Sequence, residues 1–206
     1  MRRLFWLLTG AIVLVVIVAA VAFISLRTRA NGFSTRATPS ELEEFAARTA
    51  RGMALPVGAR DKRNPIANSS EILREARAHW ADHCALCHAN DGSGDSPMGR
   101  LMYPHAPDMR KELTQRRTDG ELFYIIENGI RLSGMPAWGS GTDQDVKDTW
   151  KLVHFIRHLP DLSPEEIREM ERLNPKSLDE LEEERQEEQF LKGQPPSEAA
   201  TQHHHH

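Results

Sequence analysis

The sequence lacks the residues and patterns on which several large classes of protein depend. It contains only two cysteines among 206 residues. A single Cys pair, without two well-spaced His partners, does not supply the four ligands of a tetrahedral zinc site. No stretch alternates apolar and polar residues convincingly enough to require a β-strand. These absences favour an all-α protein and leave the two cysteines to be explained by other chemistry.

The two cysteines stand in the run Cys84-Ala85-Leu86-Cys87-His88, which is typical of a c-type haem attachment site. Thiols one helical turn apart can each add to a vinyl group of one porphyrin, and the next residue then lies beneath the iron. His88 is therefore the predicted proximal ligand, bound through a ring nitrogen. A redox dithiol is the main alternative for a bare C-x-x-C motif, but it calls for a βαβ context that is not visible around Cys84.

A second candidate ligand lies in the loop 129–139, which reads GIRLSGMPAWG and carries one methionine. Glycine lets a backbone approach a flat macrocycle closely and proline stiffens it, so this loop could place the Met135 thioether on the iron. A lone Met is otherwise usually a filler of core gaps. The rival axial ligands are His105 and, more weakly, three other methionines: Met98, Met102 and Met109.

The order of these motifs resembles the class I monohaem cytochromes c, and most of all the membrane-anchored small domains of bacterial respiratory chains. The resemblance covers residues 68–160 and rests on three features. These are a helix that ends in the haem motif, a Gly-rich loop with Pro107, and the Gly134-Met135-Pro136 turn before a closing aromatic helix. It implies one covalently bound haem c, with His88 and Met135 as its axial ligands.

The resemblance also implies further contacts around the haem. Family members usually use a proline carbonyl to accept a hydrogen bond from the proximal histidine, and Pro107 in Ala106-Pro107-Asp108 matches that residue. Such a bond would fix the orientation of the His88 ring, and Pro104 is close enough to compete for it. Trp138 and Trp150 are candidates for haem contact, with core packing as the equal alternative. The candidates for meeting the haem propionates are Arg100, Arg110 and Trp138.

The helix pattern supports an all-α haem domain from the residues alone. N-cap candidates at 68–71 precede an apolar series that runs to the haem motif. A capping box that begins at Thr118 opens a second helix, which Gly129 ends. Thr142 starts a third helix, which Pro160 stops. Because roughly 90 residues bury only a marginal core, the apolar haem is expected to supply the missing volume.

The stretch 4–26 is almost wholly apolar and reaches about 34 Å as a helix, enough to span a bilayer. Residues 1–29 are therefore predicted to form a single transmembrane anchor. A cleaved signal peptide is the alternative, since Ala20-Val21-Ala22 resembles a cleavage site, but a typical signal core is shorter. Arg2 and Arg3 would stay cytoplasmic, although arginines just beyond the span weaken this charge argument.

Four further segments follow the anchor. They are a connector 30–67, a cytochrome c haem domain 68–160, an acidic helical tail 161–202, and the His run 203–206. The connector is expected to hold a capped helix that ends near Arg51, followed by a linker. From residue 161 onward, five Lys or Arg face thirteen Asp or Glu, which indicates a solvated appendage or a docking segment for a basic partner. Removal of everything after Leu162 should then leave the haem site unchanged. The His run resembles a purification tag and is excluded from metal arguments.

The predicted ligand set bears on function. Two axial protein ligands leave no open position for a substrate, and a sulfur ligand raises the potential, so the expected role is a single-electron carrier and not an enzyme. The alternatives are a haem catalyst or a gas or redox sensor in which Met135 leaves the iron, and a structural anchor subunit with an incidental haem.

The resemblance further implies partners and a location. The expected redox partners are a quinol-oxidising complex and a terminal oxidase or reductase, within which the chain could be a subunit. The cytochrome c maturation machinery would act during assembly, and neither nucleic acid nor a small-molecule substrate is expected. Covalent haem attachment outside the bacterial inner membrane would place the haem domain in the periplasm.

Overall fold

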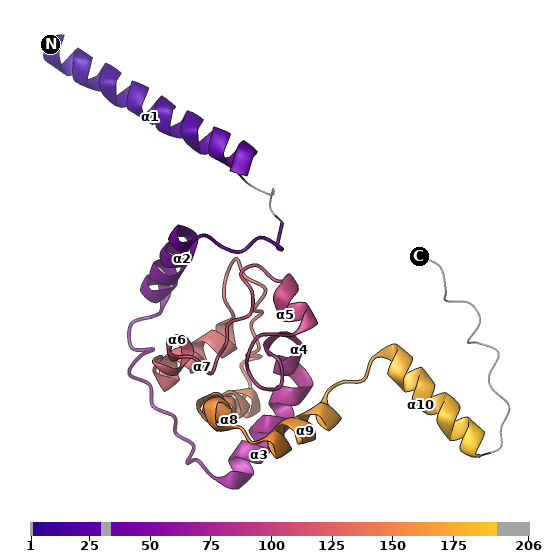
Figure 1. Ribbon diagram of the computed structural model, residues 1–206. Coiled ribbons are helices and arrows are strands. Elements are labelled where there is room, and N and C mark those ends of the chain that lie inside the picture. The colour runs from indigo at the N-terminus through magenta and orange to yellow at the C-terminus, as the bar shows by residue number, and fades with distance from the viewer. Residues whose placement is uncertain (1, 30–33, 193–206) are drawn as a thin grey trace.

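A computed structural model of the chain describes residues 2–29 and 34–192. The described residues form helices and no strand, so the predicted all-α fold is confirmed. A bundle of short helices makes up the centre of the molecule, while α1 (Arg2–Arg29) and α10 (Leu178–Leu191) lie outside it (Figure 1). The other helices are α2 (Glu41–Ala54), α3 (Ser70–His79), α4 (Ala85–His88), α5 (Pro97–Leu101), α6 (Glu112–Gln115), α7 (Asp119–Asn128), α8 (Asp143–His158) and α9 (Pro164–Leu173).

The helix α1 has the length and composition of a membrane span. Its stretch Arg2–Ser25 comprises 24 residues with a mean hydropathy of 3.0, and none of it is buried within the protein. An apolar helix of this length is compatible with one crossing of a bilayer. Its apolar side chains are exposed and do not pack on the other described residues.

The helices of the central bundle begin where the sequence predicts. Ser69 caps α3 by accepting a hydrogen bond from the backbone N–H of Ile72. Thr118 and Glu121 form the predicted capping box of α7, and Gly129 ends that helix with a φ of 66°, a conformation that costs glycine little. Thr142 caps α8 in the same way.

The core lies between α3 and α8, which pack against each other. Trp80, Val153 and Phe155 are almost fully buried there, and the rings of Trp80 and Phe155 lie 5.5 Å apart. Each such large apolar side chain contributes about 1.5–3 kcal/mol through burial. Trp150 is buried and stacks on Phe123 at 4.1 Å, so it belongs to this core.

The core does not end at residue 160. Met170 in α9 has no exposed surface, and Ile167 packs on the same cluster. Arg77 of α3 forms ion pairs with Glu166 at 2.8 Å and with Glu169 at 2.6 Å. The acidic face of α9 is thus matched by a cation of the bundle while its apolar side enters the core. The folded unit extends to the end of α9, and removal of everything after Leu162 would open it.

The connector is also more firmly attached than a linker would be. Ala59 is buried, and its carbonyl leaves no room for a side chain at Gly120 in α7. Asn64 donates a hydrogen bond from Nδ2 to the carbonyl of Trp150 at 2.8 Å. The carbonyl of Ile66 lies 2.7 Å from Nε2 of His154. The end of the connector therefore packs on α7 and α8.

The second half of the acidic tail behaves differently. Ser177 and Glu180 form a capping box at the start of α10, and the helix carries its own ion pairs, such as Arg185 with Glu182 and Lys192 with Glu188. In Figure 1 it projects away from the bundle. The end of the predicted tail and the His run 203–206 lie outside the described residues.

Candidate functional site

The haem motif sits at the end of a continuous helical path from the core. A π-helical turn, Trp80–Cys84, follows α3 and leads into α4, which ends at His88. Turns of this kind are frequent at functional sites. The indole of Trp80 donates a hydrogen bond to the carbonyl of Ala89 at 3.1 Å, and its ring lies 5.8 Å from that of His88. The buried tryptophan therefore holds the residues around His88 in place.

Burial sets the protonation states of the three motif residues. It raises the pKa of the Cys84 thiol to about 12, raises the pKa of Cys87, and lowers the pKa of His88 to about 4. Both thiols are then protonated at neutral pH and the imidazole is neutral. A catalytic dithiol needs the opposite, a lowered thiol pKa. Together with the absence of strands from the described residues, this argues against the redox alternative.

The same residues fit a covalently attached haem. Neutral imidazole is the form of histidine that binds a metal. Nδ1 of His88 is buried and has no hydrogen-bond partner among the described residues. Two reduced cysteines, Cys84 and Cys87, precede it by four residues and one residue. An apolar setting with two neutral thiols and a neutral imidazole suits a haem that is held by two thioethers and one nitrogen ligand.

The loop after the motif folds back over it and brings Pro107 close. Gly94 donates its N–H to the carbonyl of His88 at 2.9 Å. A side chain at Gly94 would collide with the carbonyl of Ala106 and lie 3.0 Å from that of Pro107, so the two backbones touch. The expected hydrogen bond from His88 Nδ1 to Pro107 is nevertheless not formed in this structure, and neither is one to Pro104.

The Met135 loop is a tight turn that closes on itself. Ile130 donates its N–H to the carbonyl of Met135 at 3.1 Å, and Ser133 Oγ accepts the N–H of Met135 at the same distance. Met135 itself is half-buried. A side chain at Gly134 would lie only 2.7 Å from the sulfur of Met102. The loop therefore packs directly on Met102, the residue that follows α5.

The helix α5 connects this loop to the haem motif. Its residue Gly99 leaves no room for a side chain, because the carbonyl of Cys87 lies against it. Gly99 and Met102 thus bring the backbone of Cys87 and the loop of Met135 to the same short helix. The sequence predicted Met102 only as a weaker rival ligand. Its contact with Gly134 joins residues that are far apart in the sequence, so no local pattern indicates it.

Trp138 lies at the outer side of the haem motif. Its ring meets that of His83, next to Cys84, edge-on at 5.6 Å. Its backbone N–H donates a hydrogen bond to the carbonyl of Ile126. Among the motif residues between the cysteines, Ala85 is buried whereas Leu86 is 64% exposed. Of these two, only Leu86 presents its side chain to solvent.

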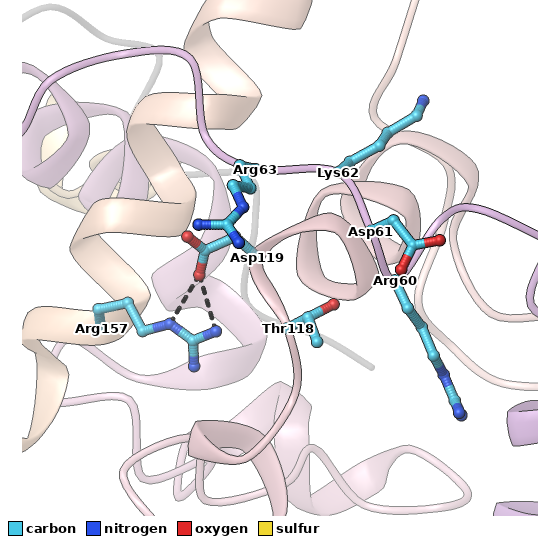
Figure 2. A pocket seen from close by; sticks show the side chains of 7 residues that line it. All are labelled: Arg60, Asp61, Lys62, Arg63, Thr118, Asp119 and Arg157. Atoms are coloured by element: carbon cyan, nitrogen blue, oxygen red, sulfur yellow. Dashed lines mark hydrogen bonds and ion pairs between the residues drawn. The ribbon is translucent and has the colours of Figure 1, made fainter.

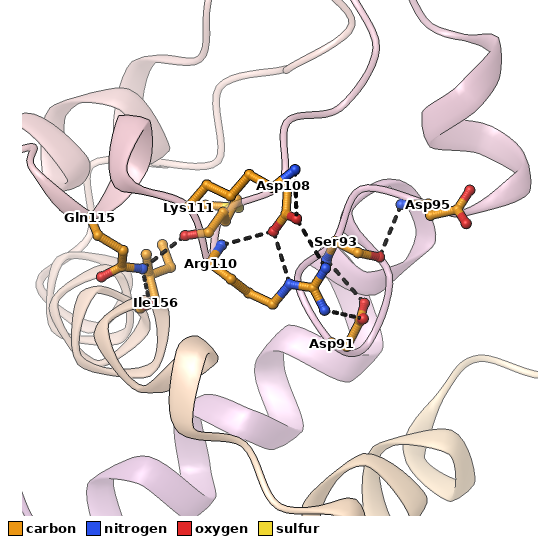
Figure 3. A network of polar contacts seen from close by, with 9 residues as sticks. Asp91, Ser93, Asp95, Asp108, Arg110, Lys111, Gln115 and Ile156 are labelled. Atoms are coloured by element: carbon orange, nitrogen blue, oxygen red, sulfur yellow. Dashed lines mark hydrogen bonds and ion pairs between the residues drawn. The ribbon is translucent and has the colours of Figure 1, made fainter.

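The arginines expected near the propionates are paired within the protein. Arg110 contacts Asp91 at 2.7 Å and Asp108 at 2.9 Å (Figure 3), and its guanidinium lowers the pKa of Asp108. Arg100 pairs with Asp95. The ion pair of Arg110 with Asp91 joins the segments 91–95 and 108–111 and so closes the loop around the motif. His105, the rival axial ligand, has a buried Nε2 without a hydrogen-bond partner among the described residues.

A pocket of about 500 Å³ lies away from the motif, between the connector and the first turn of α7 (Figure 2). Two of the arginines that line it have ion-pair partners. Arg157 bonds to Asp119 at 2.8 Å, to the carbonyl of Gln115 at 2.7 Å and to the carbonyl of Arg117. Arg60 pairs with Glu121 at 3.0 Å. The ion pair of Arg60 with Glu121 therefore attaches the connector to α7 beside this pocket.

The part of the chain that the structure describes contains no set of side chains that could bind zinc. No group of three or more His, Cys, Asp or Glu side chains gathers there closely enough to hold a metal ion. A tetrahedral structural zinc needs four such ligands. The haem interpretation is thus favoured over both alternatives for the Cys pair.

Comparison with known proteins agrees with the geometry. Residues 71–156 match a family model described as cytochrome C oxidase, cbb3-type, subunit III. The match contains the haem motif, Pro107 and Met135, and it ends within α8, before α9 and α10. No curated protein matches the chain.

Proposed function

We propose that this chain, whose residues 71–156 form a class I cytochrome c domain, carries single electrons on one covalently bound haem c with His88 and Met135 as axial ligands. The observation that carries the proposal is the partly buried haem motif within the matched region. Burial lowers the pKa of His88 to about 4, which keeps the imidazole neutral, and both cysteine thiols are reduced.

Each motif residue has a defined task in this proposal. The thiols of Cys84 and Cys87 would add across two vinyl groups. At each one the S–H bond and the π bond of the vinyl group break, and one C–S and one C–H bond form. When bound, the haem supplies a one-electron iron couple. Trp80 and the carbonyl of Ala89 hold the helix end at His88. On the other side, Ser133 and Ile130 fix the turn that presents Met135.

The membrane is part of the same proposal. The helix α1 is compatible with a single span, and we place it in the bacterial inner membrane with the haem domain in the periplasm, where c-type haem is attached. The matched family is described as a subunit of a cbb3-type oxidase, which supports electron exchange within or beside an oxidase complex, with a quinol-oxidising complex as the donor. Exposed Leu86, next to Cys87, would lie at the docking surface.

Haem attachment in the full chain tests the proposal. After expression with a cytochrome c maturation system, haem should stay with the polypeptide on a denaturing gel and resist acid-acetone extraction. Cys84→Ser and Cys87→Ser should each leave a single thioether at most, and the double variant should release its haem. Complete extraction of haem from the unaltered chain would contradict covalent attachment. Rapid binding of carbon monoxide by the unaltered reduced chain would favour the sensor or catalyst alternative.

A further inference from the structure

The helix α2 contacts the bundle through its polar face. Glu43 accepts a hydrogen bond from the hydroxyl of Tyr103 at 3.2 Å. Arg51 is half-buried, and its burial, with the neighbouring charges of Arg117 and Arg48, lowers its pKa. The side of α2 that holds Glu43 and Arg51 is therefore directed to the haem domain. Figure 1 shows α2 beside the bundle.

The opposite side of α2 is apolar and uncovered. One face of the helix carries Leu42, Phe45 and Met53, because successive spacings of three and eight residues return to the same side of a helix. Their exposed fractions are 75%, 66% and 76%, and no residue of the described helix α2 is buried. By contrast, Met170 of α9 is completely buried. An apolar helix face that points away from its own domain marks an interaction site.

The chain itself indicates which surface covers this face. The helix α1 ends at Arg29 and α2 begins at Glu41, so eleven residues, 30–40, join them. Fully extended, they span at most about 40 Å, which keeps α2 near the bilayer in which α1 is proposed to lie. Residues 27–63 hold eight Lys or Arg against four Asp or Glu, so this segment beside the span is net positive and is attracted to any anionic lipid in the leaflet that it faces.

We propose that α2 is an interfacial helix that lies on the lipid surface, with Leu42, Phe45 and Met53 inserted at the headgroup boundary. This inference rests on the proposed anchoring through α1. Because Glu43 bonds to Tyr103 and Arg51 is half-buried on the same side of the helix, α2 would stand between the domain and the bilayer. It would thereby fix the side of the haem domain that faces the membrane, in place of a free tether.

Spin labels on the haem-loaded full chain can test this in nanodiscs of phosphatidylcholine and phosphatidylglycerol. Thioether bonds consume Cys84 and Cys87, so an introduced cysteine carries the only label. Phe45→Cys reports the apolar face, and Glu44→Cys, at a side chain that is 48% exposed, is the matched control on the same helix. Val15→Cys reports the span. Since an interfacial helix inserts its apolar face about 5–10 Å, the ratio of oxygen to nickel-chelate accessibility should be several-fold higher at 45 than at 44.

The three labels separate the ways in which the proposal could fail. Equal accessibility to the nickel chelate at 45 and 44, with 15 in the bilayer, would overturn the interfacial helix and leave the anchor standing. A water-accessible label at 15 would overturn the anchor itself. Protection of the label at 45 from both reagents would mean that protein, such as a second copy of the chain, covers the face, and this too would overturn lipid contact.

Discussion

The two sides of the proposed haem site are built in different ways. On the proximal side, His88 ends a helical path that begins in α3 and is backed by buried Trp80 and Phe155. On the distal side, Met135 lies in an exposed turn held by two local hydrogen bonds and by the contact of Gly134 with Met102. The proximal side is set by the core, whereas the distal side is set by a loop. Changes on the proximal side should therefore act mainly on folding, and changes on the distal side mainly on the haem potential.

The largest expected effect comes from cutting the proximal support. A chain that ends after Leu162 loses α9, with buried Met170 and both ion pairs of Arg77, and should fail to form a stable haem domain. A chain that ends after Asn174 keeps α9 and loses only α10 and the residues beyond it. Haem content and thermal unfolding, followed by circular dichroism, would compare the two. Equal stability of the two truncated chains would show that α9 is not part of the domain.

A single substitution at the same place should have a smaller effect of the same kind. Met170→Ala removes a fully buried side chain from the core, and such changes cost about 2–5 kcal/mol of unfolding free energy. Leu181→Ala in exposed α10 is the control and should change stability by less than about 0.5 kcal/mol. Chemical denaturation of both haem-loaded variants would measure the difference. A Met170→Ala variant as stable as the control would contradict the proximal half of the comparison.

The sequence predicted local features well and non-local ones poorly. The capping box at Thr118, the helix stop at Gly129 and the haem motif are contained in a few adjacent residues. By contrast, α9 is mostly charged, and its burial depends on Ile167 and Met170 meeting a core formed by distant helices. The attachment of the connector likewise depends on Asn64 reaching the carbonyl of Trp150, 86 residues away.

The candidate site shows the same division. Cys84, Cys87 and His88 form a motif at fixed spacing, so they can be identified from the sequence alone. Arg110 was expected to face a propionate, but in the fold its guanidinium lies 2.7 Å from the carboxylate of Asp91. The two residues are 19 positions apart, so no local pattern predicts this pair. Site residues that depend on loop closure therefore require the structure.

On the distal side, Gly134→Ala should disturb the ligand loop without unfolding the domain. The added methyl group would lie 2.7 Å from the sulfur of Met102, so the loop or Met102 must move. The haem potential should shift while thermal stability changes by no more than about 1 kcal/mol. The double variant Gly134→Ala with Met102→Ala, which frees the space, should recover part of the potential. No recovery would show that Met102 does not support the loop.

The smallest effect is expected at the ion pair of Arg110 with Asp108, within the segment 108–111. Arg110 lowers the pKa of Asp108, so the stabilisation from this pair is present above the ordinary Asp pKa and is lost as pH falls through the lowered value. Because this pair is partly exposed to solvent, it should contribute about 1 kcal/mol or less. Asp108→Asn should therefore reduce stability slightly at pH 7, and this loss should shrink as the pH is lowered. Unfolding curves at pH 7 and at acidic pH test this, and an equal loss at both would assign the effect to packing.

The central claim is the axial pair of His88 and Met135, and its most direct test is Met135→Ala in the haem-loaded full chain. Optical spectra and a redox titration would be compared with Met98→Ala, a control at an exposed methionine. We expect the Met135→Ala variant to keep its covalent haem and to lose the sulfur-to-iron charge-transfer band of the oxidised protein. Its haem potential should be lower, and its reduced form should bind carbon monoxide. The control should keep the band and the potential. An unchanged band and potential in Met135→Ala would contradict the account and transfer the sixth ligand to His105 or another methionine.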